Sequence, residues 1–216
     1  MQHTGAQFVE QASQTPPKSV EEFLRFHSKG ILDKIGGFFL KLGVHPNTVT
    51  ILGLVGNFIG AGCLAFGHIT IGGIVVLLCG PLDALDGAIA RLRGDSSTFG
   101  AFVDSVTDRY SELIILCGLL VHFLLINDAL SCAVVYLAAA GSVLVSYVKA
   151  RAESLNYTAK VGILTRVERY LVLAPLLVVN QPVIAVWIIA ILANFTALQR
   201  IWFVRKQAYD QISSQK

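Results

Sequence analysis

Acidic side chains are concentrated in one otherwise apolar stretch of the chain. Asp83 and Asp86 lie three residues apart, and Asp104 and Asp108 lie four apart, so each pair occupies one face of a helix. The link between the pairs, residues 92–99, is polar and turn-like, which lets the second helix return antiparallel to the first. The spacing therefore predicts that two carboxylate pairs converge.

Four carboxylates in a small apolar site must either be protonated or share cations, because an unpaired buried charge is unfavourable. Arg91, Arg93 and Arg109 are too few and too near the ends of the stretch to neutralise all four. Arg109 is also spaced to pair with Asp104 or Glu112. Oxygen ligands at this density suit Mg²⁺ or Mn²⁺, and two ions that share carboxylates suit displacement at phosphorus. A proton or cation relay in a transporter is the alternative interpretation.

The composition indicates the kind of protein that holds these residues. The chain has 216 residues, of which 54% are hydrophobic and 14% are charged, and its mean hydropathy is +0.65. Soluble domains are about 45–50% apolar and about 25% charged. The values exclude a disordered chain, a basic domain that binds nucleic acid and an ordinary soluble enzyme. They indicate a membrane protein with several spans.

The apolar runs predict an all-α integral membrane protein with six transmembrane helices, because a span needs about 20 mostly apolar residues. The loops after the first, third and fifth runs contain no Lys or Arg, whereas the opposite side is rich in both. The positive-inside rule then places both termini and the acidic site on the cytoplasmic side of the cell membrane. The predicted spans are Thr48–Gly67, Ile69–Ala90, Gly100–Ile126, Ala129–Val148, Glu168–Asn180 and Pro182–Val204, of which the fifth is short.

Four regions follow one another along the chain. Residues 1–18 are polar and are expected to form a disordered leader. Residues 19–43 carry apolar side chains at helical spacing with lysines between them, which predicts an amphipathic helix in the membrane interface. A soluble helix packed on the body is the alternative for this segment. Residues 44–207 form the six-helix domain, and residues 208–216 form a cytoplasmic tail.

The acidic stretch also matches a known motif. Residues 83–108 read Asp83-x2-Asp86-Gly87-x2-Ala90-Arg91-x8-Gly100-x3-Asp104-x3-Asp108. This pattern resembles the signature of the CDP-alcohol phosphatidyltransferases at each of its eight fixed positions. The Pro46-Asn47-x2-Thr50 element before the first span and the number of spans are similar to that family as well, so the resemblance covers nearly the whole chain beyond the leader.

The resemblance implies a membrane transferase that binds CDP-diacylglycerol or an ether-lipid analogue. The hydroxyl of a polar alcohol would attack the lipid-side phosphorus, and CMP would leave. It implies two Mg²⁺ ions, with Mn²⁺ also possible, one held by Asp83, Asp86 and Asp104 and the other by Asp83, Asp104 and Asp108. Asp108 is the expected general base, and a homodimer is expected. The residues expected to hold the cytidine diphosphate are Pro46, Asn47, Thr48, Val49, Gly87, Arg91 and Ser97.

A second group of charged residues bears on the acceptor alcohol. Lys149, Arg151, Arg166 and Arg169 gather where the fourth and fifth spans meet the cytoplasm. The positive-inside rule and anionic lipid headgroups are one explanation for such a cluster. A pocket for an acceptor that already bears a phosphate is the other, because guanidinium groups bind phosphate with paired hydrogen bonds.

The segment that begins at Ser146 favours the second explanation. Its pattern Ser-Tyr-x-Lys-Ala-Arg-Ala-Glu looks like the corresponding segment of phosphatidylinositol-phosphate synthases and their archaeal-lipid relatives, which use inositol 1-phosphate. Phosphatidylglycerophosphate synthases, which use glycerol 3-phosphate, remain the alternative. By this resemblance, the residues expected to bind the acceptor phosphate are Ser146, Lys149, Arg151, Arg169 and Arg200.

Overall fold

A computed structural model describes residues 20–94 and 97–214, with side chains placed from residue 30 to residue 213. The predicted leader, residues 1–18, lies outside the described residues. The described chain is all helical, as expected, and contains no strand. Its helices are α2 Val20–Lys41, α3 Pro46–Ala65, α4 Ile69–Arg93, α5 Thr98–Leu125, α6 Ala129–Ser154, α7 Arg166–Val178 and α8 Pro182–Ser214.

Local residue chemistry accounts for where these helices begin and end. Pro46 opens α3, a position where its missing N–H costs no helical bond. The Ser97 hydroxyl caps α5 by accepting from the N–H of Gly100 at 2.9 Å. Asp128 caps α6, and bonds from the hydroxyl and N–H of Ser131 lower the pKa of its carboxyl. α4 ends at Gly94, whose φ of 74° favours glycine.

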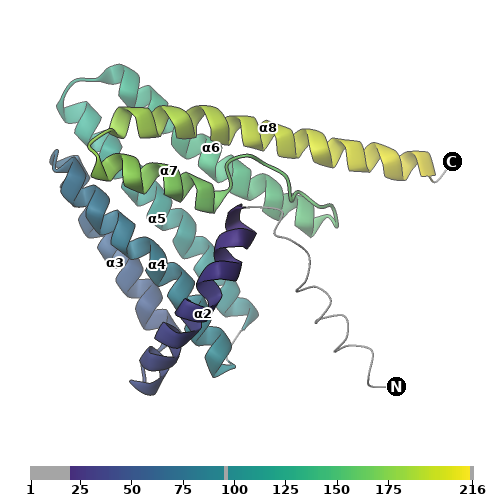
Figure 1. The fold of residues 1–216 in the computed structure, drawn as a ribbon. Coiled ribbons are helices and arrows are strands. Elements are labelled where there is room, and N and C mark those ends of the chain that lie inside the picture. The colour runs from purple at the N-terminus through teal and green to yellow at the C-terminus, as the bar shows by residue number, and fades with distance from the viewer. Residues whose placement is uncertain (1–19, 95–96, 215–216) are drawn as a thin grey trace.

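The helices form a bundle in which α3 packs against α4 and α5, α6 packs against α8, and α7 packs against α4 and α8 (Figure 1). The turns that follow α3, α5 and α7 lie at the same end of the bundle in Figure 1. These three turns are the segments without Lys or Arg. α2 crosses the C-terminal half of α4, where Gly36 lies close to Ala88, Ile89 and Leu92.

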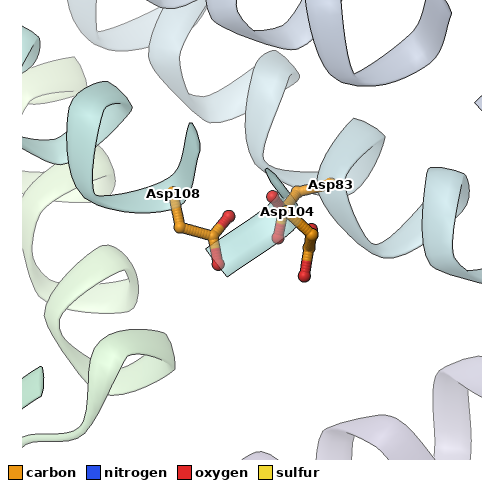
Figure 2. Close-up of side chains that lie close together, drawn as sticks. All are labelled: Asp83, Asp104 and Asp108. Carbon is orange, nitrogen blue, oxygen red and sulfur yellow. The ribbon is translucent and has the colours of Figure 1, made fainter. Parts of the chain in front are cut away.

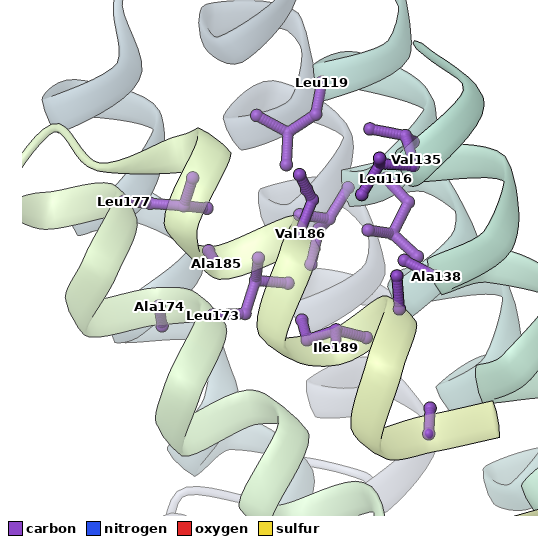
Figure 3. Packing of buried hydrophobic residues seen from close by; sticks show 14 of the residues in the cluster. Leu116, Leu119, Val135, Ala138, Leu173, Ala174, Leu177, Ala185, Val186 and Ile189 are labelled. Carbon is purple, nitrogen blue, oxygen red and sulfur yellow. The ribbon is translucent and has the colours of Figure 1, made fainter. Parts of the chain in front are cut away.

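Apolar side chains from α5, α6, α7 and α8 fill the main core (Figure 3). Leu119, Phe123, Leu177 and Ile189 are almost completely buried there. Many other large apolar side chains face outward along the helices, including Leu78, Leu130 and Tyr136. Apolar side chains exposed at this density are expected where lipid rather than water is the solvent.

Within the described residues, four helices are long and apolar enough to cross a membrane: α3, α4, α6 and α8. The chain is therefore a multi-pass membrane protein. α5 falls outside this set although it has 28 residues, because it carries Asp104, Asp108, Arg109 and Glu112. α7 has 13 residues, or about 20 Å at 1.5 Å per residue, against a hydrocarbon core of about 30 Å. Six passes and an interfacial position for α2 remain predictions.

Helical structure continues beyond the sixth predicted span. α8 continues to Ser214, so most of the predicted tail, residues 208–216, is helical. The segment after Val204 contains neither Gly nor Pro, so nothing in it stops a helix. The amide of Gln207 also holds this extension to the α6–α7 loop, since its Nε2 donates to the carbonyl of Thr158 at 2.6 Å.

Candidate active site

Three of the predicted carboxylates come together in the structure. Asp83 of α4 and Asp104 and Asp108 of α5 each place a carboxylate oxygen within 4.8 Å of the others (Figure 2). Asp108 is only 7% exposed, whereas the other two are half-buried. α4 and α5 make little direct contact with each other, and α3 packs against both.

Asp86 lies outside this trio. Its carboxylate is 5% exposed and accepts a hydrogen bond of 2.5 Å from the hydroxyl of Thr50. The same hydroxyl lies 3.3 Å from the carbonyl oxygen of Pro46. Asp86 is therefore tied to the first turn of α3. The sequence contained the signal for this contact, because Thr50 closes the Pro46-Asn47-x2-Thr50 element.

Arg166, the first residue of α7, contacts two carboxylates of the trio. Its Nη2 lies 2.8 Å from an oxygen of Asp83, and its Nη1 donates to Oδ2 of Asp108. One guanidinium thus joins a carboxylate of α4 to a carboxylate of α5. Arg166 was expected only as one of four cations around an acceptor phosphate. Its contacts with the trio were not predicted, because residues 58 to 83 positions apart cannot be paired from spacing alone.

The trio has the properties of a divalent cation site. Oδ1 of Asp108 is buried and has no hydrogen-bond partner among the described residues, which is a costly arrangement for a carboxylate. Three carboxylates and one guanidinium leave the cluster with a net negative charge. Carboxylate oxygens are the ligands that Mg²⁺ and Mn²⁺ prefer. The residues present therefore fit a divalent metal.

A buried ion pair lies beside the trio. Arg169 is 2% exposed, and its Nε and Nη2 lie 2.6 and 2.9 Å from the two carboxylate oxygens of Glu112. Of the two partners expected for Arg109, Asp104 and Glu112, the structure pairs Glu112 with Arg169 instead. Arg109 donates instead to the backbone carbonyl of Ser105, one turn earlier in its own helix, because Glu112 faces α7.

The α6–α7 loop, residues 155–165, is held against α8. Arg200 is 5% exposed and donates to the carbonyls of Val161 and Val145 at 2.8 and 2.6 Å. The hydroxyl of Thr196 accepts from the N–H of Leu164 at 3.1 Å. Residues 196 and 200 are one turn apart, so they form a polar edge of α8 that fixes the loop leading to Arg166.

The residues expected to bind the acceptor phosphate divide into two groups. Ser146 and Lys149 are half-buried and Arg151 is exposed, all near the end of α6. The guanidinium groups of Arg169 and Arg200 instead bind Glu112 and backbone carbonyls in this structure. Their binding to an acceptor stays a prediction, and the structure adds a structural role for both.

The residues expected to hold the cytidine diphosphate also differ in exposure. Pro46 and Val49 are buried, whereas Asn47 and Thr48 are exposed in the first turn of α3. Arg91 is exposed, and its Nη2 lies 3.9 Å from a carboxylate oxygen of Asp33 in α2.

The other two members of this set lie on α4 and before α5. Gly87 follows Asp86 directly, and a Cβ at Gly87 would make an ordinary van der Waals contact, 3.6 Å, with Nη1 of Arg91. Ser97 uses its hydroxyl as the cap of α5.

The chain is similar to known proteins over most of its length. The family model described as CDP-alcohol phosphatidyltransferase matches residues 43–206. An archaetidylinositol phosphate synthase from Pyrococcus horikoshii is 35% identical over 177 residues, which are 82% of this chain and 92% of that protein. A phosphatidylinositol phosphate synthase from Streptomyces avermitilis is 33% identical over 209 residues, covering 88% of this chain and 84% of the relative.

Solved structures of a Mycobacterium tuberculosis phosphatidylinositol phosphate synthase are also similar. The one with CDP-DAG bound has a TM-score of 0.74 and 30% sequence identity, and the match covers 81% of this chain and 93% of that one. The one in complex with manganese and citrate has a TM-score of 0.74 and 30% identity, with 80% of this chain and 88% of that one covered.

Proposed function

Because the chain belongs to the CDP-alcohol phosphatidyltransferase family, we propose that it transfers the phosphatidyl group of CDP-diacylglycerol, or of an ether-lipid analogue, to inositol 1-phosphate. The products are phosphatidylinositol phosphate, or its ether-lipid counterpart, and CMP. The observation that carries the proposal is the trio of carboxylates within 4.8 Å, with a buried oxygen of Asp108 that lacks a protein partner. The names of the relatives support the acceptor.

The metal in this proposal is a pair of Mg²⁺ ions, one bound by Asp83, Asp86 and Asp104 and one by Asp83, Asp104 and Asp108. The manganese complex of the mycobacterial relative supports a divalent cation. When bound, the ions supply positive charge that offsets the diphosphate and the departing CMP.

Asp108 is the proposed general base. The acceptor hydroxyl forms a new bond to the lipid-side phosphorus, the bond from that phosphorus to the CMP oxygen breaks, and CMP leaves with the electron pair. Oδ1 of Asp108 takes the hydroxyl proton, since this oxygen has no other partner among the described residues.

The substrates bind to exposed or half-buried polar groups of α3, α4 and α6. Asn47 and Thr48, at the N-terminal turn of α3, and Arg91 hold the cytidine diphosphate, because helix N–H groups and guanidinium groups bind phosphate oxygens. Lys149 and Arg151 bind the acceptor phosphate, and Ser146 contributes a hydroxyl. These three residues share the C-terminal part of α6.

The proposed topology has six passes, α3 to α8, with the site and both termini in the cytoplasm. The turns without Lys or Arg gather at one end of the bundle (Figure 1), which supports this orientation. α2 lies in the interface, because its exposed apolar side chains repeat at helical spacing on one face. They are Ile31, Ile35 and Phe38, and Leu42, which follows the last residue of α2, continues the pattern. The protein is further proposed to form a homodimer.

The test is CMP release by the purified protein with CDP-diacylglycerol and Mg²⁺, with inositol 1-phosphate, glycerol 3-phosphate, free inositol and serine offered separately. Inositol 1-phosphate is expected to give the highest kcat/KM. A preference for glycerol 3-phosphate would retain the phosphate pocket and reject the inositol acceptor. A preference for free inositol or serine would reject the pocket. Ion flux in proteoliposomes without CMP release would support a transporter instead.

A further inference from the structure

Helix α4 contains a proline, Pro81, two residues before Asp83 of the acidic trio. Pro81 has no N–H, so the carbonyl of Leu77, four residues earlier, lacks its helical donor. The hydroxyl of Tyr170 in α7 donates to this carbonyl at 2.7 Å and lies 3.2 Å from the carbonyl of Val76. A carbonyl without its helical donor needs another hydrogen-bond donor in a membrane helix. The hydroxyl of Tyr170 supplies the donor that Pro81 lacks.

Two glycines of α4 let α7 approach closely enough for this bond. A Cβ at Gly80 would collide with the ring of Tyr170. A Cβ at Gly73 would lie 2.6 Å from backbone atoms of Leu177 and Val178. Gly73 and Gly80 are two helical turns apart, as are Leu177 and Tyr170. The antiparallel register of α7 on α4 is therefore fixed at both ends.

This register delivers Arg166 to the acidic trio. Arg166 lies one turn before Tyr170, and Asp83 lies just beyond Gly80, so the two side chains meet where α7 begins. The Nη2 of Arg166 is 2.8 Å from Asp83, and Nη1 bonds Asp108. A shift of α7 by a fraction of a turn would break both contacts, because one planar guanidinium makes them together.

We propose that Tyr170 is a positioning residue: it docks α7 on the carbonyl that Pro81 leaves without a donor and thereby holds Arg166 against Asp83 and Asp108. A divalent cation then binds to the three carboxylates only when the guanidinium of Arg166 moves away from them. This inference rests on the proposed function, since it concerns the same metal site. The hydroxyl of Tyr170 thus positions α7 on α4, and it belongs neither to the acidic motif nor to the basic cluster.

The inference predicts an unusual direction of change. In Tyr170→Phe, Arg166 is held less firmly and competes less with a cation, so Mn²⁺ binds more tightly in the absence of substrate. The KM for CDP-diacylglycerol is expected to be unchanged. A tyrosine that only stabilised the fold would have the opposite effect on the metal, since a loosened carboxylate cage binds Mn²⁺ more weakly.

The experiment measures Mn²⁺ binding by electron paramagnetic resonance in detergent-solubilised full-length protein. Tyr170→Phe is expected to lower the Kd about threefold, and Arg166→Ala about tenfold, the change expected when one positive charge is removed beside a cation site. In the Arg166→Ala background, Tyr170→Phe is expected to have no further effect. Tyr136→Phe, an exposed tyrosine on α6, is the matched control and leaves the Kd unchanged.

A double-mutant cycle of Tyr170 and Pro81 tests the hydrogen bond from the Tyr170 hydroxyl to the carbonyl of Leu77. Pro81→Ala supplies an N–H to the carbonyl of Leu77, so Tyr170→Phe should lower the thermal midpoint in the Pro81 protein and much less in the Pro81→Ala protein. Weaker Mn²⁺ binding by Tyr170→Phe, an unchanged Kd, or equal effects on the midpoint in both backgrounds would overturn the inference. Absence of Mn²⁺ binding in every protein, wild type included, would overturn the proposed function as well.

Discussion

Removal of one partner of the buried pair formed by Glu112 and Arg169 should destabilise the fold strongly. Glu112→Gln keeps the size of the side chain but removes its charge and replaces one acceptor with a donor that faces a guanidinium. Two hydrogen bonds, of 2.6 and 2.9 Å, are then disturbed. The Arg169 side chain is 2% exposed, so water cannot replace the lost partner.

The magnitude follows from that burial. Breaking a buried pair by removing one partner costs about 3–5 kcal/mol, and Gln retains one acceptor, so we expect a loss of about 3 kcal/mol. For a chain of this size, about 2–4 °C of thermal midpoint corresponds to 1 kcal/mol, so the midpoint should fall by about 6–12 °C. The assay is thermal unfolding of both proteins in the same detergent.

Asp83→Asn is the matched comparison, because its partner Arg166 is far more accessible. The side chains of that pair are 42% and 34% exposed, and exposed pairs contribute about 1 kcal/mol or less. The double variant Glu112→Leu with Arg169→Met should recover most of the stability, since apolar replacement of both partners is often neutral. A Glu112→Gln midpoint within about 2 °C of wild type would refute the assignment of this pair as a buried structural contact.

Three further outcomes are expected. Asp108→Asn abolishes transfer while CDP-diacylglycerol binding survives, measured as CMP release and lipid binding on one preparation; turnover near the wild-type rate would remove Asp108 from the mechanism. Thr50→Val loses the bond to Asp86 and about 1 kcal/mol of stability, seen as a lower midpoint that Thr50→Ser restores; equal midpoints for the two variants would contradict that bond. Arg200→Leu removes the donors to Val161 and Val145 and should expose residues 155–165 to limited proteolysis, whereas an unchanged cleavage pattern would show that the loop is held by other contacts.

Local pattern was sufficient to predict the helices and the acidic residues. The apolar runs located the helices from α3 to α8 within a few residues at most ends, because length and hydropathy are local properties. The spacing of Asp83, Asp104 and Asp108 indicated that they share a site. The sixth run predicted a span that ends at Val204 and did not indicate whether the helix continues beyond it, which it does to Ser214.

Contacts between distant segments could not be predicted from the sequence. Arg169 and Glu112 are 57 positions apart, and nothing in a single sequence distinguishes that partner from Arg109, which is three residues from Glu112. The role of Arg166 depends on the register of α7 on α4, which Gly73, Gly80 and Tyr170 set through packing. Such contacts follow from the fold, so they could be assigned only after the helices were placed.

The central claim is that the aspartates of α4 and α5 bind divalent cations over a CDP-lipid. Its most direct test is anomalous scattering from crystals grown with Mn²⁺ and CDP-diacylglycerol. The account predicts two manganese peaks in contact with the diphosphate, the first bound by Asp83, Asp86 and Asp104 and the second by Asp83, Asp104 and Asp108, with Arg166 displaced from the trio. A bound CDP-lipid with no anomalous peak among these carboxylates, and with Arg166 still between them, would contradict it.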